Sequence, residues 1–276
     1  MISQGGKQVL GAIIGDVIGS AYERPSQSTK KYDFDLWTDR SHFTDDTVMT
    51  LAIGQALKSH LAGNESFVEA CRYQMRQYGR TYPNLAYGKS FKAWLSASDQ
   101  AANPSYGNGA AMRVSPIAWF ATNQNQCLQL AKSQALVSHD HEEAVIGAQA
   151  AALAVFLARQ GARKIEIKQA ITQLADYQLD TDLADIRPGY YFQVRASQSV
   201  PQAIMAFLQS QNFEDAIRLA VSLGGDADTL AAIAGSIGQA YYGVPATMVD
   251  QVRAYLPDQL WQDYQSLWAW LRTRTN

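Results

Sequence analysis

The sequence predicts an all-α fold, with the whole chain, 1–276, forming a single compact domain. Apolar residues recur almost throughout at the three- and four-residue spacing of a helix. No convincing series of alternating strands interrupts this pattern. Hydrophobic residues make up 47% of the chain and charged residues 17%, a balance that supports a sizeable core.

The first predicted helix, residues 5–21, combines apolar residues with small ones. Gly11, Gly15 and Gly19 recur every four residues, which allows a neighbouring segment to approach closely. Asp16 interrupts the apolar run, and a carboxylate in an apolar helix must find polar partners. It serves either as support for another functional acid or as a purely structural hydrogen-bonding group, and we favour structural support.

Ten further segments show helical spacing. One of them, 143–160, is apolar on nearly every side, which predicts a central position surrounded by other helices. The last, 259–272, carries tryptophans at helical spacing that suit packing in the core or in an oligomer. The other predicted helices are 47–61, 67–78, 90–96, 125–138, 165–174, 200–210, 213–221 and 229–242.

Three long loops separate these helices: 24–43, 97–113 and 177–199. The second contains Asn103-Pro104 and Gly107-Asn108-Gly109, which break regular structure. Loops of this length in a compact domain are often functional. We therefore look for the site where such loops meet the ends of helices.

Charge and cysteine content exclude several classes of protein. The formal net charge is −2, which gives no general nucleic-acid binding surface, although a single terminal nucleotide as substrate needs no basic stripe. The two cysteines, Cys71 and Cys127, lie in no metal-ligand spacing and indicate a reducing, cytoplasmic location. The apolar runs 9–18 and 144–158 are interrupted by an acid or too short to cross a bilayer, so we expect no membrane partner.

Two acidic segments stand out, Thr44-Asp45-Asp46-Thr47 and Gly224-Gly225-Asp226-Ala227-Asp228-Thr229. Each ends a loop and opens an apolar helix, so helix capping is the simplest explanation for either segment alone. Capping needs one side chain, or two at most, and does not require two carboxylates flanked by hydroxyls. The glycine pair suits a positive φ angle or a close approach to a ligand.

A shared metal site explains both segments if they face each other. Two carboxylates about 4 Å apart repel by roughly 4 kcal/mol at an effective dielectric constant near 20, and a divalent cation reverses this repulsion. Carboxylate and hydroxyl oxygens without a nearby thiolate suit Mg²⁺ or Mn²⁺, whereas zinc is expected to recruit histidine or cysteine.

The sequence resembles the ADP-ribosylglycohydrolase family, which includes the dinitrogenase reductase-activating glycohydrolases. Five segments carry the resemblance, in family order, and cover most of the chain from about residue 8 to 243. They are Gly11-Ala12 through Gly15-Asp16 with Gly19 and Glu23, Phe43-Thr44-Asp45-Asp46-Thr47, Tyr106-Gly107-Asn108-Gly109-Ala110-Ala111-Met112-Arg113, Ser138-His139-Asp140-His141, and Ser222-Leu223-Gly224-Gly225-Asp226-Ala227-Asp228-Thr229.

This resemblance implies a fold, a cofactor and a reaction. The implied fold is a compact orthogonal helical bundle with a central cleft that holds two divalent cations, Mg²⁺ or Mn²⁺. The implied reaction is hydrolysis of the glycosidic bond between ADP-ribose and its acceptor, so the expected partner is an ADP-ribosylated protein, nucleic-acid end or small molecule. The positions that match the family's metal ligands are Thr44, Asp45, Asp46, Asp226, Asp228 and Thr229.

Glu23 matches the family's acidic position after the first helix and is the candidate catalytic residue. Cleavage at the anomeric carbon passes through an oxocarbenium-like state and needs a proton shuttle. We expect Glu23 to supply it while the cations orient the ribose hydroxyls and polarise a water molecule. By composition alone, Glu23 reads as a solvated loop acid.

The glycine-rich loop and one histidine are the candidate substrate-binding residues. Backbone amides of a glycine loop bind phosphates well, and Tyr106 either borders the nucleotide or is a surface aromatic. Arg113 pairs with a phosphate or a structural acid, and these two possibilities weigh equally. His139 is a candidate to position the ribose or diphosphate, although a capping histidine at a helix start is more common. The predicted substrate-binding set is Ser105, Tyr106, Gly107, Asn108, Gly109 and His139.

Two other functions fit parts of the pattern. A non-catalytic ADP-ribose-binding protein has no need of the acids, yet all six ligand positions and Glu23 are present. A metal-dependent nucleotide phosphohydrolase releases AMP or phosphate instead of ADP-ribose. The loops 24–43 and 177–199 are the expected filters for the acceptor, which the sequence does not identify.

Overall fold

The chain forms an all-α structure, as predicted. The computed structural model describes residues 9–63, 65–97 and 104–274, and in these ranges the only bridge between extended segments joins Gly107 and Arg195. The helices are α1 (Gly11–Ser20), α2 (Asp45–Leu61), α3 (Phe67–Thr81), α4 (Lys89–Ser96), η1 (Asn108–Ala110), α5 (Ser115–Phe120), α6 (Gln124–Leu136), α7 (Glu142–Arg159), α8 (Lys164–Ala175), α9 (Leu183–Ile186), α10 (Ala196–Gln209), α11 (Phe213–Val221), α12 (Ala227–Tyr242), α13 (Ala246–Arg253) and α14 (Asp258–Arg272).

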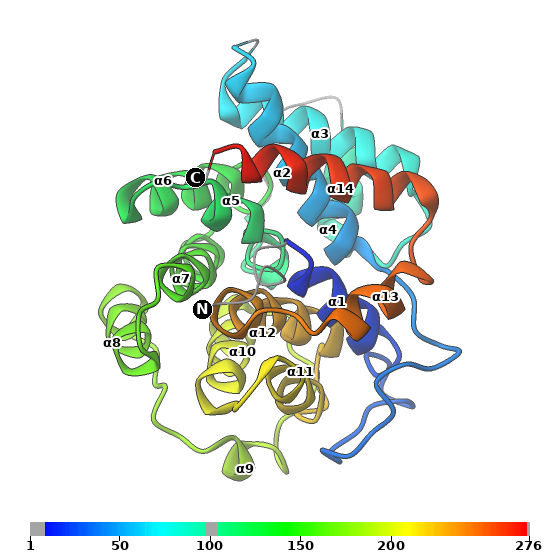
Figure 1. Cartoon of the computed structure of the whole chain (residues 1–276), viewed down its shortest axis with the longest axis vertical. Helices are drawn as coiled ribbons and strands as arrows, with labels where there is room; N and C mark the ends of the chain where they lie inside the picture. The colour runs from blue at the N-terminus through cyan, green and yellow to red at the C-terminus, as the bar shows by residue number, and fades with distance from the viewer. Residues whose placement is uncertain (1–8, 64, 98–103, 275–276) are drawn as a thin grey trace.

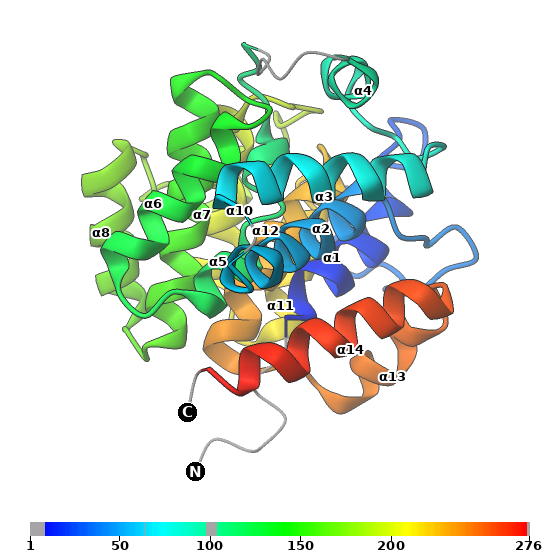
Figure 2. The same ribbon diagram turned by 90° about the horizontal axis from the view of Figure 1, so that it is seen from above.

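The centre of the bundle is the pair α1 and α12. Every residue of α1 is buried, and α12 is buried from Ala227 to Gln239. Helices α7, α10 and α11 pack around α12 on one side, while α2, α3 and α14 lie on the other, as Figures 1 and 2 show. A hydrophobic core cluster runs from Val9 to Leu271 through all of these helices.

The predicted central helix is α7, and the structure confirms that it is enclosed. It contacts α5, α6, α8, α10 and α12, and most of its alanines are buried. Alanine and glycine side chains are small, so neighbouring helices approach it from several directions. Of the C-terminal tryptophans, Trp261, Trp268 and Trp270 are partly buried and pack against the core, as expected for core packing.

Several short helices were not predicted from the sequence. They are α5, α9 and α13, and α10 begins at Ala196, four residues before the predicted start. All three short helices lie in segments predicted to be loops or left unassigned, because helices of four to eight residues give too few periodic positions to recognise. None of the helices in the described ranges is both long enough and apolar enough to cross a membrane.

Candidate active site

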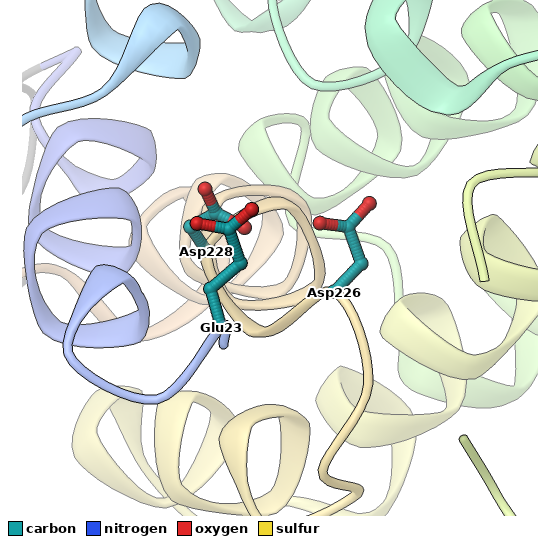
Figure 3. A group of neighbouring side chains, drawn as sticks. All are labelled: Glu23, Asp226 and Asp228. Atoms are coloured by element: carbon teal, nitrogen blue, oxygen red, sulfur yellow. The ribbon is translucent and has the colours of Figure 1, made fainter. Parts of the chain in front are cut away.

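The close contact of α1 and α12 brings three acidic side chains together. A Cβ atom added at Gly19 would lie 2.4 Å from the Ala227 carbonyl oxygen, so the last turn of α1 touches the first turn of α12. The chain leaves α1 at Ser20 and reaches Glu23 within three residues, beside the start of α12. The carboxylates of Glu23, Asp226 and Asp228 each place one oxygen within 4.8 Å of the others, and Figure 3 shows them converging.

Asp16 fixes the start of α2, which carries the first acidic segment. Its buried carboxylate accepts hydrogen bonds from Thr44 N at 2.9 Å and Thr44 Oγ1 at 2.7 Å. It also accepts from Thr47 N at 3.1 Å and from the Thr47 hydroxyl. Four donors from one helix start on one carboxylate make Asp16 a structural support, the role that we favoured from the sequence. This anchor sets the position of Asp45 and Asp46.

Thr44 is also the N-cap of α2. Its Oγ1 accepts from the Asp46 amide at 3.2 Å while donating to Asp16. The capping explanation and the acidic cluster are therefore both present at this segment. At α12, by contrast, Asp226 is the N-cap residue but makes no side-chain cap hydrogen bond, so its carboxylate is directed elsewhere.

A cavity of about 800 Å³ opens above these acids. This volume suits a nucleotide-sized ligand. Every sequence-predicted site residue except Thr44 lines it, so two acidic segments about 180 positions apart share one pocket. The lining site residues are Glu23, Asp45, Asp46, Ser105, Tyr106, Gly107, Asn108, Gly109, His139, Asp226, Asp228 and Thr229.

The crowded acids resist ionisation in the bare protein. Burial, and then the charge of Asp16, raises the pKa of Asp45 to about 7. Burial and neighbouring carboxylates also raise the pKa of Asp46 and Asp228 well above the usual range. Asp46 Oδ2 is buried without a hydrogen-bond partner in the described residues. Hard oxygen donors with an orphaned carboxylate oxygen fit a divalent cation of the Mg²⁺ or Mn²⁺ type.

The second acidic segment depends on its glycine pair. Gly224 adopts φ +68°, and a Cβ there would lie 2.8 Å from Ser28 Oγ. A Cβ at Gly225 would lie 2.4 Å from the Tyr190 ring. The Lys30 ammonium, on the 24–43 loop, donates to the carbonyl oxygens of both Leu223 and Tyr190. Glycine is therefore required here so that two long loops can close on the turn before Asp226.

The predicted substrate loop is held at both ends. Asn108 N donates to Val194 O at 2.8 Å, and Ala196 N donates to Tyr106 O at 2.9 Å. Asn108 Nδ2 donates to Asp226 Oδ2 at 2.7 Å, which ties the loop to the acidic cluster. The backbone N–H of Asn108 is therefore already bonded within the protein, and it is not available to bind a phosphate as the sequence pattern suggested.

Tyr106 stands at the mouth of the cavity, with 45% of its surface exposed. The Arg195 guanidinium lies 4.9 Å from the ring centroid, and Arg195 in turn pairs with Glu143. Ser197 Oγ also donates to Glu143 Oε2 at 2.6 Å. This network braces one side of the tyrosine ring.

The two histidines of the central segment have separate positions. His141 is the N-cap of α7 and accepts from Glu143 N at 3.2 Å, the common role of a histidine at a helix start. His139 is only 5% exposed and lines the cavity. Burial, followed by the charge of Arg113, lowers the pKa of His139 to about 3, so its imidazole is neutral.

Arg113 lines the cavity, and the acid that was one of its two expected partners is absent among the described residues. It is fully buried, and its Nε donates to Gln134 Oε1 at 2.7 Å while Nη2 donates to Ser138 Oγ at 2.8 Å. In the described part of the chain it forms no ion pair with a carboxylate. Arginine here bonds to neutral oxygens of α6 and the turn that follows it.

The sequence model of the ADP-ribosylglycohydrolase family matches residues 7–275, nearly the whole chain. The chain belongs to the ADP-ribosylglycohydrolase family. This assignment confirms the resemblance that the five ordered segments indicated. The all-α fold of the chain is consistent with this hydrolase family.

Individual members of the family are similar over most of their length. ADP-ribosylhydrolase ARH3 of Xenopus tropicalis is 28% identical over 302 residues, covering 85% of this chain and 86% of that protein. ADP-ribosylarginine hydrolase Tri1 of Pseudomonas putida (strain GB-1) is 29% identical, covering 88% and 72%. A solved structure titled ADP-ribosylglycohydrolase-related protein complex superposes with a TM-score of 0.69 at 24% identity, covering 96% of each chain, and so supports the fold.

The structure adds cavity residues that sequence reasoning missed in this member of the family. Phe91 of α4 lines the cavity, as do Phe192 and Val194 of the 177–199 loop. The aromatic residues of the long 177–199 loop, some of which are exposed, were the signal that could have identified the lining positions on that loop. Among the described residues lining the cavity, none comes from 24–43, and Lys30 of that loop bonds to the turn before Asp226.

Proposed function

We propose that this chain, acting as one domain over 1–276, hydrolyses the glycosidic bond that joins ADP-ribose to an acceptor. The observation that carries the proposal is the convergence of Glu23 with Asp226 and Asp228 in a nucleotide-sized cavity. Membership of the ADP-ribosylglycohydrolase family supplies the substrate class.

The acidic clusters are the proposed binding site for two divalent cations, Mg²⁺ or Mn²⁺. Asp45, Asp46, Asp226, Asp228 and Thr229 line the cavity and offer oxygen donors. The hydroxyl of the remaining ligand, Thr44, donates to Asp16 and accepts from Asp46 N, which leaves one lone pair for a cation. When bound, such ions supply positive charge that orients hydroxyl groups and increases the acidity of water.

Glu23 is the proposed catalytic residue. Burial, and then the charges of Asp226 and Asp16, raises the pKa of Glu23. A carboxylate with a raised pKa accepts and returns a proton readily, as glycosidic cleavage requires. Glu23 is partly exposed at the cavity, so it can contact water and substrate there.

The part of the cavity wall formed by the glycine-rich loop is the proposed binding surface for ADP-ribose. Ser105, Gly107 and Gly109 offer a narrow backbone edge, and Tyr106 offers an aromatic face at the mouth. Asn108 links this wall to the acidic cluster through Asp226. The exposed side chains of Phe192 and Val194 then border the acceptor, so we assign acceptor choice to the 177–199 loop.

A panel of ADP-ribosylated substrates tests this function. Peptides carrying ADP-ribose on arginine or serine and DNA carrying it on terminal thymidine are incubated with the chain, and the products are separated. We expect free ADP-ribose from at least one substrate, loss of its release with EDTA, and recovery on addition of Mg²⁺ or Mn²⁺. Undiminished release in EDTA contradicts the cation-dependent mechanism.

The same products separate two other functions. AMP or phosphate among them indicates a phosphohydrolase, because that cleavage breaks a phosphorus–oxygen bond. Binding of ADP-ribose without turnover of any substrate indicates a non-catalytic protein. We favour hydrolysis, since Glu23 and the six proposed ligand positions are all present.

A second prediction isolates Glu23. The Glu23→Gln variant is expected to lower kcat by at least about 100-fold, because the amide does not shuttle a proton. Cation binding measured by calorimetry is expected to persist. Glu69→Gln, on the surface of α3 outside the cavity, is the matched control and is expected to keep wild-type turnover. Full turnover by Glu23→Gln with bound cations rules out this role.

A further inference from the structure

The buried polar groups behind His139 form a chain that ends at the cavity. Arg113 Nη2 donates to Ser138 Oγ at 2.8 Å, and Ser138 Oγ lies 2.8 Å from His139 Nδ1. All three side chains are buried. The turn after α6 fixes the backbone, because the amides of both Ser138 and His139 donate to Ala135 O.

The direction of each hydrogen bond in this chain can be deduced. Arginine only donates, so Ser138 Oγ accepts from Arg113. The Ser138 hydroxyl then has one proton to give, and His139 Nδ1 is the acceptor found for it among the described residues. Nδ1 is therefore the acceptor nitrogen of a neutral imidazole, and Nε2 carries the proton.

The other ring nitrogen faces the substrate loop. A Cβ atom added at Gly109 would lie 3.2 Å from His139 Nε2, and one added at Gly107 would lie 3.8 Å from it. These glycines and His139 line the same cavity. Because neither glycine carries a side chain, the Nε2–H group remains open to a ligand beside the loop.

Arg113 is itself held rigidly. Its Nε donates to Gln134 Oε1 at 2.7 Å, and Gln134 Nε2 donates to Ala110 O at 2.8 Å, at the end of η1. Its guanidinium also lies 5.7 Å from the Phe91 ring, which flanks His139. One residue thus links the substrate loop, α6 and the histidine.

We propose that Arg113 is a positioning residue that acts through Ser138 to fix His139 as the Nε2–H tautomer, so that His139 donates a hydrogen bond to an acceptor oxygen of bound ADP-ribose. The identity of the ligand rests on the proposed function, whereas the tautomer is a property of the free protein. A fixed donor needs no reorganisation when the substrate binds.

Nitrogen-15 NMR of the histidine-labelled full chain tests the tautomer without substrate. We expect His139, assigned by the loss of its signals in His139→Gln, to show a protonated Nε2 and a bare Nδ1. Ser138→Ala and Arg113→Lys are expected to populate the Nδ1–H form. Ser236→Ala, which removes a buried hydroxyl that bonds within α12, is expected to leave the tautomer unchanged.

A protonated Nδ1 in the wild-type chain, or an unchanged tautomer in Ser138→Ala, overturns the proposal. Addition of ADP-ribose is expected to shift the Nε2 resonance in the wild-type chain and less in Ser138→Ala, and an unshifted resonance overturns the ligand contact. With an active substrate, Ser138→Ala is expected to lower kcat/KM by about 10-fold, the value of one hydrogen bond. Absence of all turnover counts against the proposed function alone, since the tautomer is read without substrate.

Discussion

In the absence of divalent cations, Asp228→Asn is expected to make the chain more stable, although it destroys cation binding and activity. We expect the free energy of unfolding to rise by roughly 1 to 3 kcal/mol, part of the repulsion of about 4 kcal/mol between charges 4 Å apart. The kcat of Asp228→Asn is expected to be at least about 100-fold below that of the wild-type chain, at an Mg²⁺ concentration that saturates the wild-type chain.

The sign follows from the acidity of this residue. Burial, and then the charges of Asp226 and Asp46, raises the pKa of Asp228 well above the ordinary value of 3.8. The folded chain therefore binds more protons than the unfolded chain at intermediate pH. Its free energy of unfolding is highest below the unfolded-state pKa and falls as pH rises through the folded-state pKa. Ionisation of Asp228 in the folded chain therefore opposes folding, and the neutral amide removes that cost.

Differential scanning calorimetry with EDTA and with Mg²⁺ measures both effects. The wild-type chain is expected to unfold at a higher temperature when the cation is present, because ligands that bind only the folded state stabilise it. Asp228→Asn is expected to show a higher Tm in EDTA and no response to Mg²⁺. Asp250→Asn, on the exposed surface of α13, is the control. A lower Tm of Asp228→Asn in EDTA would show that the carboxylate stabilises the bare protein.

The parts of the site that were predictable carry a local signal. An acidic residue next to a hydroxyl at the start of an apolar run indicates a helix N-terminus, and Thr44 and Asp46 form such a cap. Four carboxylates in two such segments then exceed what capping requires. This excess suggested a shared site if the two segments face each other, the family resemblance implied a common cleft, and both segments line one cavity.

The parts that were not predictable depend on contacts between distant segments. The carbonyl partners of Lys30 lie 160 and 193 residues further along the chain, and nothing near Lys30 in sequence announces them. No acid pairs with Arg113 in the described chain, and its hydrogen-bond partners there include neutral groups 21 and 25 residues away. Long side chains with several donors have many possible partners, and only the packed fold selects among them.

The glycine face of α1 is expected to be the most sensitive packing site in the chain. A Cβ atom at residue 15 would lie 2.0 Å from the Ala231 carbonyl oxygen, which belongs to the α12 backbone and cannot rotate away. Gly15→Ala is therefore expected to lower the free energy of unfolding by about 3 kcal/mol or more. The Tm is expected to fall by roughly 6 to 12 °C.

Activity is expected to fall with it, because the same helix pair positions Glu23 against Asp226 and Asp228. A separation of α1 from α12 on the order of 1 Å costs about 100-fold in rate when it misplaces reacting groups. Gly238→Ala in α12 is the matched control: its Cβ would meet atoms no closer than 3.4 Å, so higher helix propensity is expected to stabilise the chain by up to about 1 kcal/mol. Thermal unfolding and turnover of both variants measure the contrast. Equal stability of the two variants would contradict the claim that α1 and α12 pack too closely at residue 15 to admit a side chain.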